Sequence, residues 1–224
     1  MFNKTLKLFI TVGFIFLTVS ISAAAGNMPT DIAELEKLAE SGNMEAQYAI
    51  GVKYHVGEEV KKDIDKAIDF YLKAAAKGYT PAMNEMGFIY LEGEGDIQDT
   101  HEAYVWFSRA AEKGNSAAQY NLAGMYYNGN GISPDIQKAF MWYIRSAENG
   151  NIYAQKLLGN KYFKGEGVKQ DYAMAYIWLS KAAERGDRHS IKLLANMYKN
   201  GKFVKKDAKH ASELENRLST CSDY

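Results

Sequence analysis

A single period of 36 residues runs through most of the chain without an insertion. Glycine, aspartate and alanine positions recur at this spacing together with five tyrosines, namely Tyr54, Tyr90, Tyr126, Tyr162 and Tyr198. A fixed period of this length is typical of a solenoid, in which each repeat buries its apolar face against its neighbours. The period therefore indicates a repeat array in which every unit has the same internal structure.

Each repeat reads as two helices joined by a short loop. In repeat 1 the first helix is predicted over about residues 44–56, with Ala46 and Tyr54 on one side, and Gly57 supplies the left-handed residue after its end. Asp63 has the side chain of a helix N-cap, and the second helix is predicted over residues 67–76. The predicted fold class is an all-α solenoid of αα-hairpin repeats.

The period also places the boundaries along the chain. We predict a signal peptide at 1–25, an N-terminal capping helix at 26–42, repeats at 43–78, 79–114, 115–150, 151–186 and 187–218, and a polar tail at 219–224. The first and last repeats lack the second glycine of the loop, where Glu59 and Phe203 stand instead. We expect the loop of repeat 1 to be shaped differently, because a side chain disfavours positive φ, and repeat 5 to be a solvated C-terminal cap.

The first 25 residues have the pattern of a secretory signal peptide. Lys4 and Lys7 precede an apolar run over 8–21, and the small residues 22–25 follow it. The run is shorter than the roughly 20 apolar residues that span a bilayer. We therefore expect cleavage after Ala25 and export to the periplasm or beyond. The lone Cys221 cannot form a disulfide within the chain, and pairing between chains stays open.

The repeated residues carry a resemblance to a known family. The pattern Ala46-x-x-x-Ile50-Gly51-x-x-Tyr54-x-x-Gly57, completed by Asp63, Ala67 and Ala74-Ala75-x-x-Gly78, resembles the Sel-one-like repeat family of tetratricopeptide-like solenoids. The resemblance implies a right-handed αα superhelix whose first helices line a concave surface, and a role as an adaptor. Some exported members resemble immunity proteins that neutralise secreted effectors, or assembly factors of the cell envelope. Others, with paired cysteines in each repeat, have been regarded as β-lactamase-like, and this chain lacks those cysteines.

No group of residues in the sequence predicts catalysis, a metal or a cofactor. The four histidines are scattered, and His101-Glu102 lacks the second histidine of a zinc protease motif. Three carboxylates between Gly93 and Asp99 miss the alternating spacing of a calcium loop. With 27 basic and 27 acidic residues, the composition gives no indication of nucleic-acid binding.

The side of each first helix that faces away from the repeated residues is the predicted partner-binding surface. It comprises Tyr48, Val52, His55, Asn84, Phe88, Leu91, Tyr120, Tyr127, Tyr153, Lys156, Asn160, Phe163, Lys192, Asn196 and Lys199. Aromatic rings beside amides suit an extended peptide or a partner's helix, and lysines at one end favour an acidic segment. The alternative is that these rings only pack between repeats.

From these observations we expect an exported, non-enzymatic scaffold that binds a protein or peptide ligand through this surface. Two alternatives stay open at this point. One is an immunity protein that neutralises a secreted enzyme, and the other is a β-lactamase-like hydrolase of the cell envelope.

Overall fold

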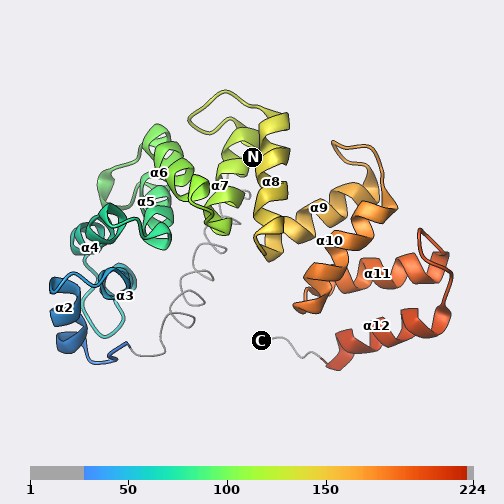
Figure 1. Ribbon diagram of the computed structural model, residues 1–224, viewed down its shortest axis with the longest axis horizontal. Coiled ribbons are helices and arrows are strands. Elements are labelled where there is room, and N and C mark those ends of the chain that lie inside the picture. Colours follow the sequence, from blue (N-terminus) through green and yellow to red (C-terminus); the bar gives the residue numbers. More distant parts are fainter. Residues whose placement is uncertain (1–27, 221–224) are drawn as a thin grey trace. The chain divides into compact units, whose positions relative to one another are not determined.

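The computed structural model describes residues 28–220, which contain eleven α-helices, α2 to α12, one short 3-10 helix and no strand (Figure 1). This confirms the predicted all-α hairpin solenoid. None of the helices in this range is long and apolar enough to cross a membrane. The predicted signal peptide and Cys221 lie outside the described residues.

The chain divides into two compact units, one ending at Asp135 and the other beginning at Ile136. Unit 1 contains α2 (Ile32–Glu40), α3 (Met44–Val56), α4 (Ile64–Ala76), α5 (Thr80–Glu92), η2 (Glu94–Asp96), α6 (Thr100–Glu112) and α7 (Ser116–Asn128). Unit 2 contains α8 (Ile136–Glu148), α9 (Ile152–Lys164), α10 (Tyr172–Glu184), α11 (Arg188–Asn200) and α12 (Ala208–Thr220). Within each unit every helix packs on the next one along the chain.

The helix ends follow the repeated polar residues and glycines. The Asp63 side chain accepts a hydrogen bond from the Lys66 N–H at 3.0 Å, which confirms the predicted N-cap. Gly57 ends α3 in the left-handed conformation with φ 82°. The second helix begins at Ile64, earlier than the predicted residue 67, because it starts directly after its cap.

The loops of repeats 1 and 5 keep the left-handed backbone despite their side chains. Glu59 has φ 65° and Phe203 has φ 66°, close to the φ of 71° at Gly95 and at Gly131. The expectation of a differently shaped loop at Glu59 in repeat 1 is therefore wrong. The two helices that each loop joins fix its path, and the side chain adopts a conformation that L residues rarely take.

Glycines in the first helices let the paired helices approach closely. A Cβ atom on Gly51 would lie 2.8 Å from the ring of Tyr71, and one on Gly87 would lie 2.6 Å from the ring of Phe107. Both rings are fully buried. These glycines are therefore required by packing between α3 and α4, and between α5 and α6.

A buried glutamine at the start of three first helices joins each to the helix before it. Gln47, Gln119 and Gln155 each donate from Nε2 to a backbone carbonyl in the last turn of the preceding helix, at 3.0 Å. Each of these carbonyls also accepts a hydrogen bond from the N–H of the glycine after the helix, namely Gly42, Gly114 and Gly150. The glutamine therefore adds a second hydrogen bond that joins the two helices.

Candidate partner-binding surface

Eight of the predicted partner-binding residues lie in unit 1, on α3, α5 and α7. Four of these are buried, with at most 6% of their surface exposed: Tyr48, Val52, Asn84 and Phe88. The ring of Tyr48 lies 5.8 Å from that of Tyr71, and the ring of Phe88 lies 5.3 Å from that of Phe107. These large side chains fold over onto the second helix of their own repeat, so they leave almost no surface for a partner.

The other four residues of unit 1 remain accessible to different degrees. His55, Leu91 and Tyr120 are half-buried, and Tyr127 is 41% exposed. They come from three successive first helices of one unit. The accessible part of the predicted surface in unit 1 is therefore smaller than the helical spacing indicated, and its binding of a partner stays a prediction.

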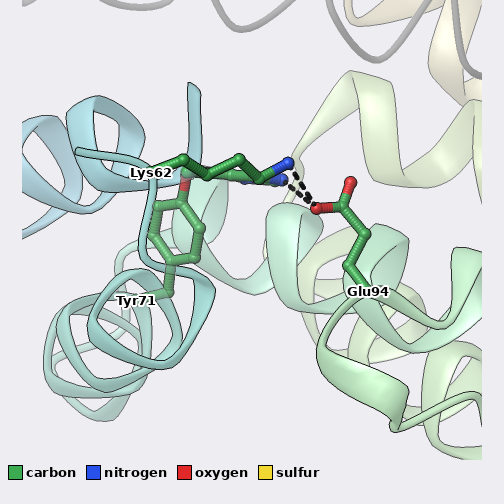
Figure 2. A network of polar contacts seen from close by, with 4 residues as sticks. Lys62, Tyr71 and Glu94 are labelled. Carbon is green, nitrogen blue, oxygen red and sulfur yellow. Dashed lines mark hydrogen bonds and ion pairs between the residues drawn. The ribbon is translucent and has the colours of Figure 1, made fainter. Parts of the chain in front are cut away.

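A polar network crosses from repeat 1 to repeat 2 beside this surface (Figure 2). The Nδ1 atom of His55 lies 3.2 Å from the Tyr71 hydroxyl, and its Nε2 atom lies 3.1 Å from Oε2 of Glu94. Lys62 donates to the same Glu94 oxygen at 3.3 Å. Figure 2 shows the Glu94 carboxylate facing Lys62 across the gap between the two repeats.

The network fixes the charge of Glu94. The hydrogen bond from His55, helped by the positive charges of His55 and Lys62, outweighs burial and lowers the pKa of Glu94 to about 2. Burial raises the pKa of Tyr71 well above its usual value, so its hydroxyl keeps its proton. The arrangement is an ion pair between Lys62 and Glu94, with His55 held beside it by hydrogen bonds. Of these residues, only His55 was predicted from the sequence as a partner-binding residue.

A second polar group is buried on α5 and α7 of unit 1. The Asn121 side chain donates from Nδ2 to the side-chain Oδ1 of Asn84 at 3.0 Å, and Nδ2 of Asn84 donates to Oε1 of Glu85 at 3.3 Å. Glu85 is only 4% exposed. Burial raises the pKa of Glu85 to about 8, with further upward contributions from the charges of Glu92 and Glu94, against the Asn84 hydrogen bond that lowers it.

Sequence reasoning missed Glu85 because it lies about 100° round α5 from the predicted surface residue Asn84, at the edge of the predicted surface. The signal was nevertheless present, because the equivalent positions of repeats 4 and 5 are Leu157 and Leu193. A buried carboxyl at a position that holds leucine in repeats 4 and 5 is a costly departure from the repeat pattern.

In unit 2 the predicted residues lie on α9 and α11. Tyr153, Lys156, Asn160 and Phe163 are half-buried, whereas Lys192, Asn196 and Lys199 are exposed. Lys156 forms an ion pair with Asp187 at 3.0 Å. Burial raises the pKa of Asp187, but hydrogen bonds from Ser190 and Lys156 lower it by more than burial raises it. The pKa of Asp187 is therefore below its usual value. Asp187 is the N-cap of α11, so Lys156 has a structural partner on the next first helix.

Within residues 28–220 no three His, Cys, Asp or Glu side chains are grouped so that they could hold a metal ion. The His55 network contains a base, a phenol and a carboxylate, but no serine, threonine or cysteine nucleophile takes part in it.

Comparison with known families identifies the repeat. The model of the Sel1 repeat matches residues 45–79, 80–115, 116–151, 152–187 and 189–213. Among curated proteins none matches this chain.

Several solved structures are similar to this one. A protective antigen of uropathogenic Escherichia coli, c5321, has 38% sequence identity and a TM-score of 0.75, and the match covers 86% of this chain but 41% of the antigen. A Sel1 repeat protein of Oxalobacter formigenes has 33% identity and a TM-score of 0.75, over 85% of this chain and 78% of that one. The immunity protein Pa5087 of Pseudomonas aeruginosa shares the fold, with 19% identity and a TM-score of 0.57 over 92% of this chain and 81% of that one.

Proposed function

Because the chain belongs to the Sel1 repeat family, we propose that it is a non-enzymatic scaffold that binds another protein through the first-helix face of unit 1. This face is defined by His55, Leu91, Tyr120 and Tyr127 together with the buried Glu85 beneath it. We propose that the protein acts outside the cytoplasm, since residues 1–25 have the pattern of a signal peptide.

The observation that carries the proposal is the burial of Glu85 and its two amide neighbours under this face. Burying such groups costs free energy, and Leu157 and Leu193 show that the same position of the repeat accepts an apolar residue. Stability of the fold therefore does not account for Glu85. These three buried side chains bond to one another and join α5 to α7, so they fix the relative position of the accessible Leu91, Tyr120 and Tyr127 that would make the contact.

The exposed part of the face supplies the contact surface in this account. Tyr120 and Tyr127 come from α7 and Leu91 from α5, and tyrosine is enriched among the residues that dominate binding energy at interfaces. Glu94 is paired with His55 and Lys62, and Glu85 is buried, so the carboxyl that remains accessible beside Leu91 on α5 is that of the half-buried Glu92. A segment that presents N–H donors or a basic side chain would complement it.

The test is affinity capture with the full chain and with matched variants. The double variant Tyr120→Ala/Tyr127→Ala should keep its helical circular dichroism and lose at least about tenfold in affinity for the captured protein, because two interface tyrosines are removed. Leu72→Ala is the control, because Leu72 is also 41% exposed but lies on the second helix α4.

Unchanged affinity of the double variant, or an equal loss in the control, would contradict the proposed face. The stoichiometry of the captured material separates the two kinds of binding protein. A set of envelope proteins is expected of a scaffold, whereas a single enzyme in one-to-one ratio is expected of an immunity protein. The likeness to the Pseudomonas protein concerns the fold alone and gives no preference for the second role.

A further inference from the structure

A groove of about 730 Å³ lies in unit 2. It is lined by Tyr162, Val168, Lys169, Gln170, Asp171, Tyr172, Ala173 and Phe203. The lining comes from the end of α9, the loop before α10, the first residues of α10, and the loop between α11 and α12. The groove therefore lies between the loops of repeats 4 and 5.

Phe203 is the unusual residue of this groove. Its backbone is left-handed with φ 66°, and its side chain is 60% exposed. Repeats 2, 3 and 4 have glycine here, which takes the same conformation without strain. Phe203 thus combines an unfavourable backbone with an apolar ring in water. Since strain of this kind is retained mainly at functional sites, the ring is a candidate contact for a ligand.

Other rings adjoin Phe203 and the groove. The Tyr176 ring lies 5.7 Å from that of Phe203, and the Tyr172 ring lies 5.5 Å from that of Phe163, one of the predicted partner-binding residues. The Nζ atom of Lys202 lies 5.0 Å from the centre of the Tyr172 ring. The groove therefore offers flat aromatic surface next to a positive charge.

The charges around the groove are mainly positive. Lys169 lines it, Lys202 lies over its tyrosine, and Lys205 and Lys206 are exposed in the adjoining loop. The acidic Asp171 accepts hydrogen bonds from the N–H groups of Ala173 and Met174, so its carboxylate is engaged as the cap of α10. The lysines are therefore available to pair with an anionic ligand, because the Asp171 carboxylate is already engaged at the start of α10.

We propose that this groove binds an acidic protein segment that carries an aromatic side chain. The aromatic ring of the segment would lie against Phe203 and Tyr172, and its carboxylates would pair with Lys169 and Lys202. Charge complementarity selects this occupant. A lipid surface would need the apolar and basic groups on a protruding edge, whereas Tyr162 and Tyr172 line a hollow. The proposal does not depend on the first-helix face of unit 1.

The experiment uses the full chain and fluorescein-labelled peptides with blocked ends. The probe is a short peptide in which glutamates flank a tryptophan, and its two controls replace the glutamates by lysines or the tryptophan by serine. Fluorescence anisotropy should show binding of the first peptide alone, weakening as salt is raised. Phe203→Gly should lower its affinity at least about tenfold while allowing the left-handed backbone.

Glu59→Gly is the matched control variant, because Glu59 has the same backbone conformation in the loop of repeat 1. It should bind the acidic peptide as the unchanged protein does. The proposal is overturned if the acidic peptide fails to bind at millimolar concentration, if the lysine peptide binds equally, or if Phe203→Gly binds as well as Glu59→Gly. Binding to phosphatidylglycerol vesicles that Phe203→Gly abolishes, without binding to the acidic peptide, would assign the groove to a membrane surface instead.

Discussion

One position of the repeat holds residues of different chemistry in different repeats. It holds Ala49, Glu85, Asn121, Leu157 and Leu193 in the five successive repeats. In unit 2 both residues are apolar, whereas in unit 1 Glu85 and Asn121 belong to a chain of hydrogen bonds through Asn84. The same backbone site therefore accepts either chemistry, and the polar choice has to be explained by something other than folding.

The buried carboxyl gives a prediction for stability against pH. The pKa of Glu85 is raised from 4.5 to about 8, so the folded protein binds more protons than the unfolded chain between these values. Its contribution to stability is complete below about pH 4.5 and is lost as pH rises towards 8, at up to about 1.4 kcal/mol per pH unit.

Glu85→Gln should remove this loss. Compared with the unchanged protein, the variant should gain relative stability as pH rises from 5 to 8, as measured by urea unfolding at several pH values. Glu92, whose pKa is also raised by burial, contributes a slope of the same sign in both proteins. Stability curves of the two proteins that run parallel across this range would show that Glu85 is ionised in the folded state.

At the scale of elements, the repeat pattern predicted most of what the structure contains. The first helix of repeat 1 was expected at about residues 44–56 and is found at Met44–Val56, because the capping residues and glycines that bound it are local signals. The second helix was predicted too short, since Ile64 follows its cap without belonging to the repeated alanine pattern.

Burial on the first-helix face could not be predicted in the same way. Helical spacing gives the direction in which Tyr48 leaves its helix, but its burial depends on the rings of Tyr71 and Tyr79, which come from the next helix and the loop after it. The His55–Glu94 contact joins residues 39 apart in the sequence. Such contacts depend on how repeats are placed on one another, which no local pattern specifies.

The loop that follows α7 gives a prediction at this scale. Gly131 has φ 71°, and a Cβ atom there would lie 2.4 Å from the backbone oxygen of Thr100 at the start of α6. Gly131→Ala should therefore lower the free energy of unfolding by about 2–4 kcal/mol, through a left-handed alanine and a clash with backbone that cannot move aside.

Gly114→Ala is the control for this loop. Gly114 has φ 89°, but no atom lies within 4 Å of the position of an added Cβ. The control should cost only the conformational part, about 1 kcal/mol, in the same denaturation experiment. Equal losses for the two variants would mean that the loop does not pack on the start of α6.

At the scale of the whole molecule, the two units carry different chemistry on one repeated framework. Unit 1 has the buried carboxyl of Glu85 and accessible tyrosines on its first helices, whereas unit 2 has the Phe203 groove with lysines around it. Membership of the Sel1 repeat family explains the framework, since the matched repeats span residues 45–213 with a single one-residue gap. The residues that differ between repeats carry the proposed recognition.

The central claim, that the first-helix face of unit 1 contacts the partner, is tested most directly by site-specific photo-crosslinking. A benzophenone side chain is placed at position 127 in one variant and at position 72 in another, since Tyr127 and Leu72 are equally exposed, at 41%. The account predicts that irradiation links the captured partner to position 127 on α7 and leaves position 72 on α4 unlinked. A crosslink from position 72 alone would contradict it.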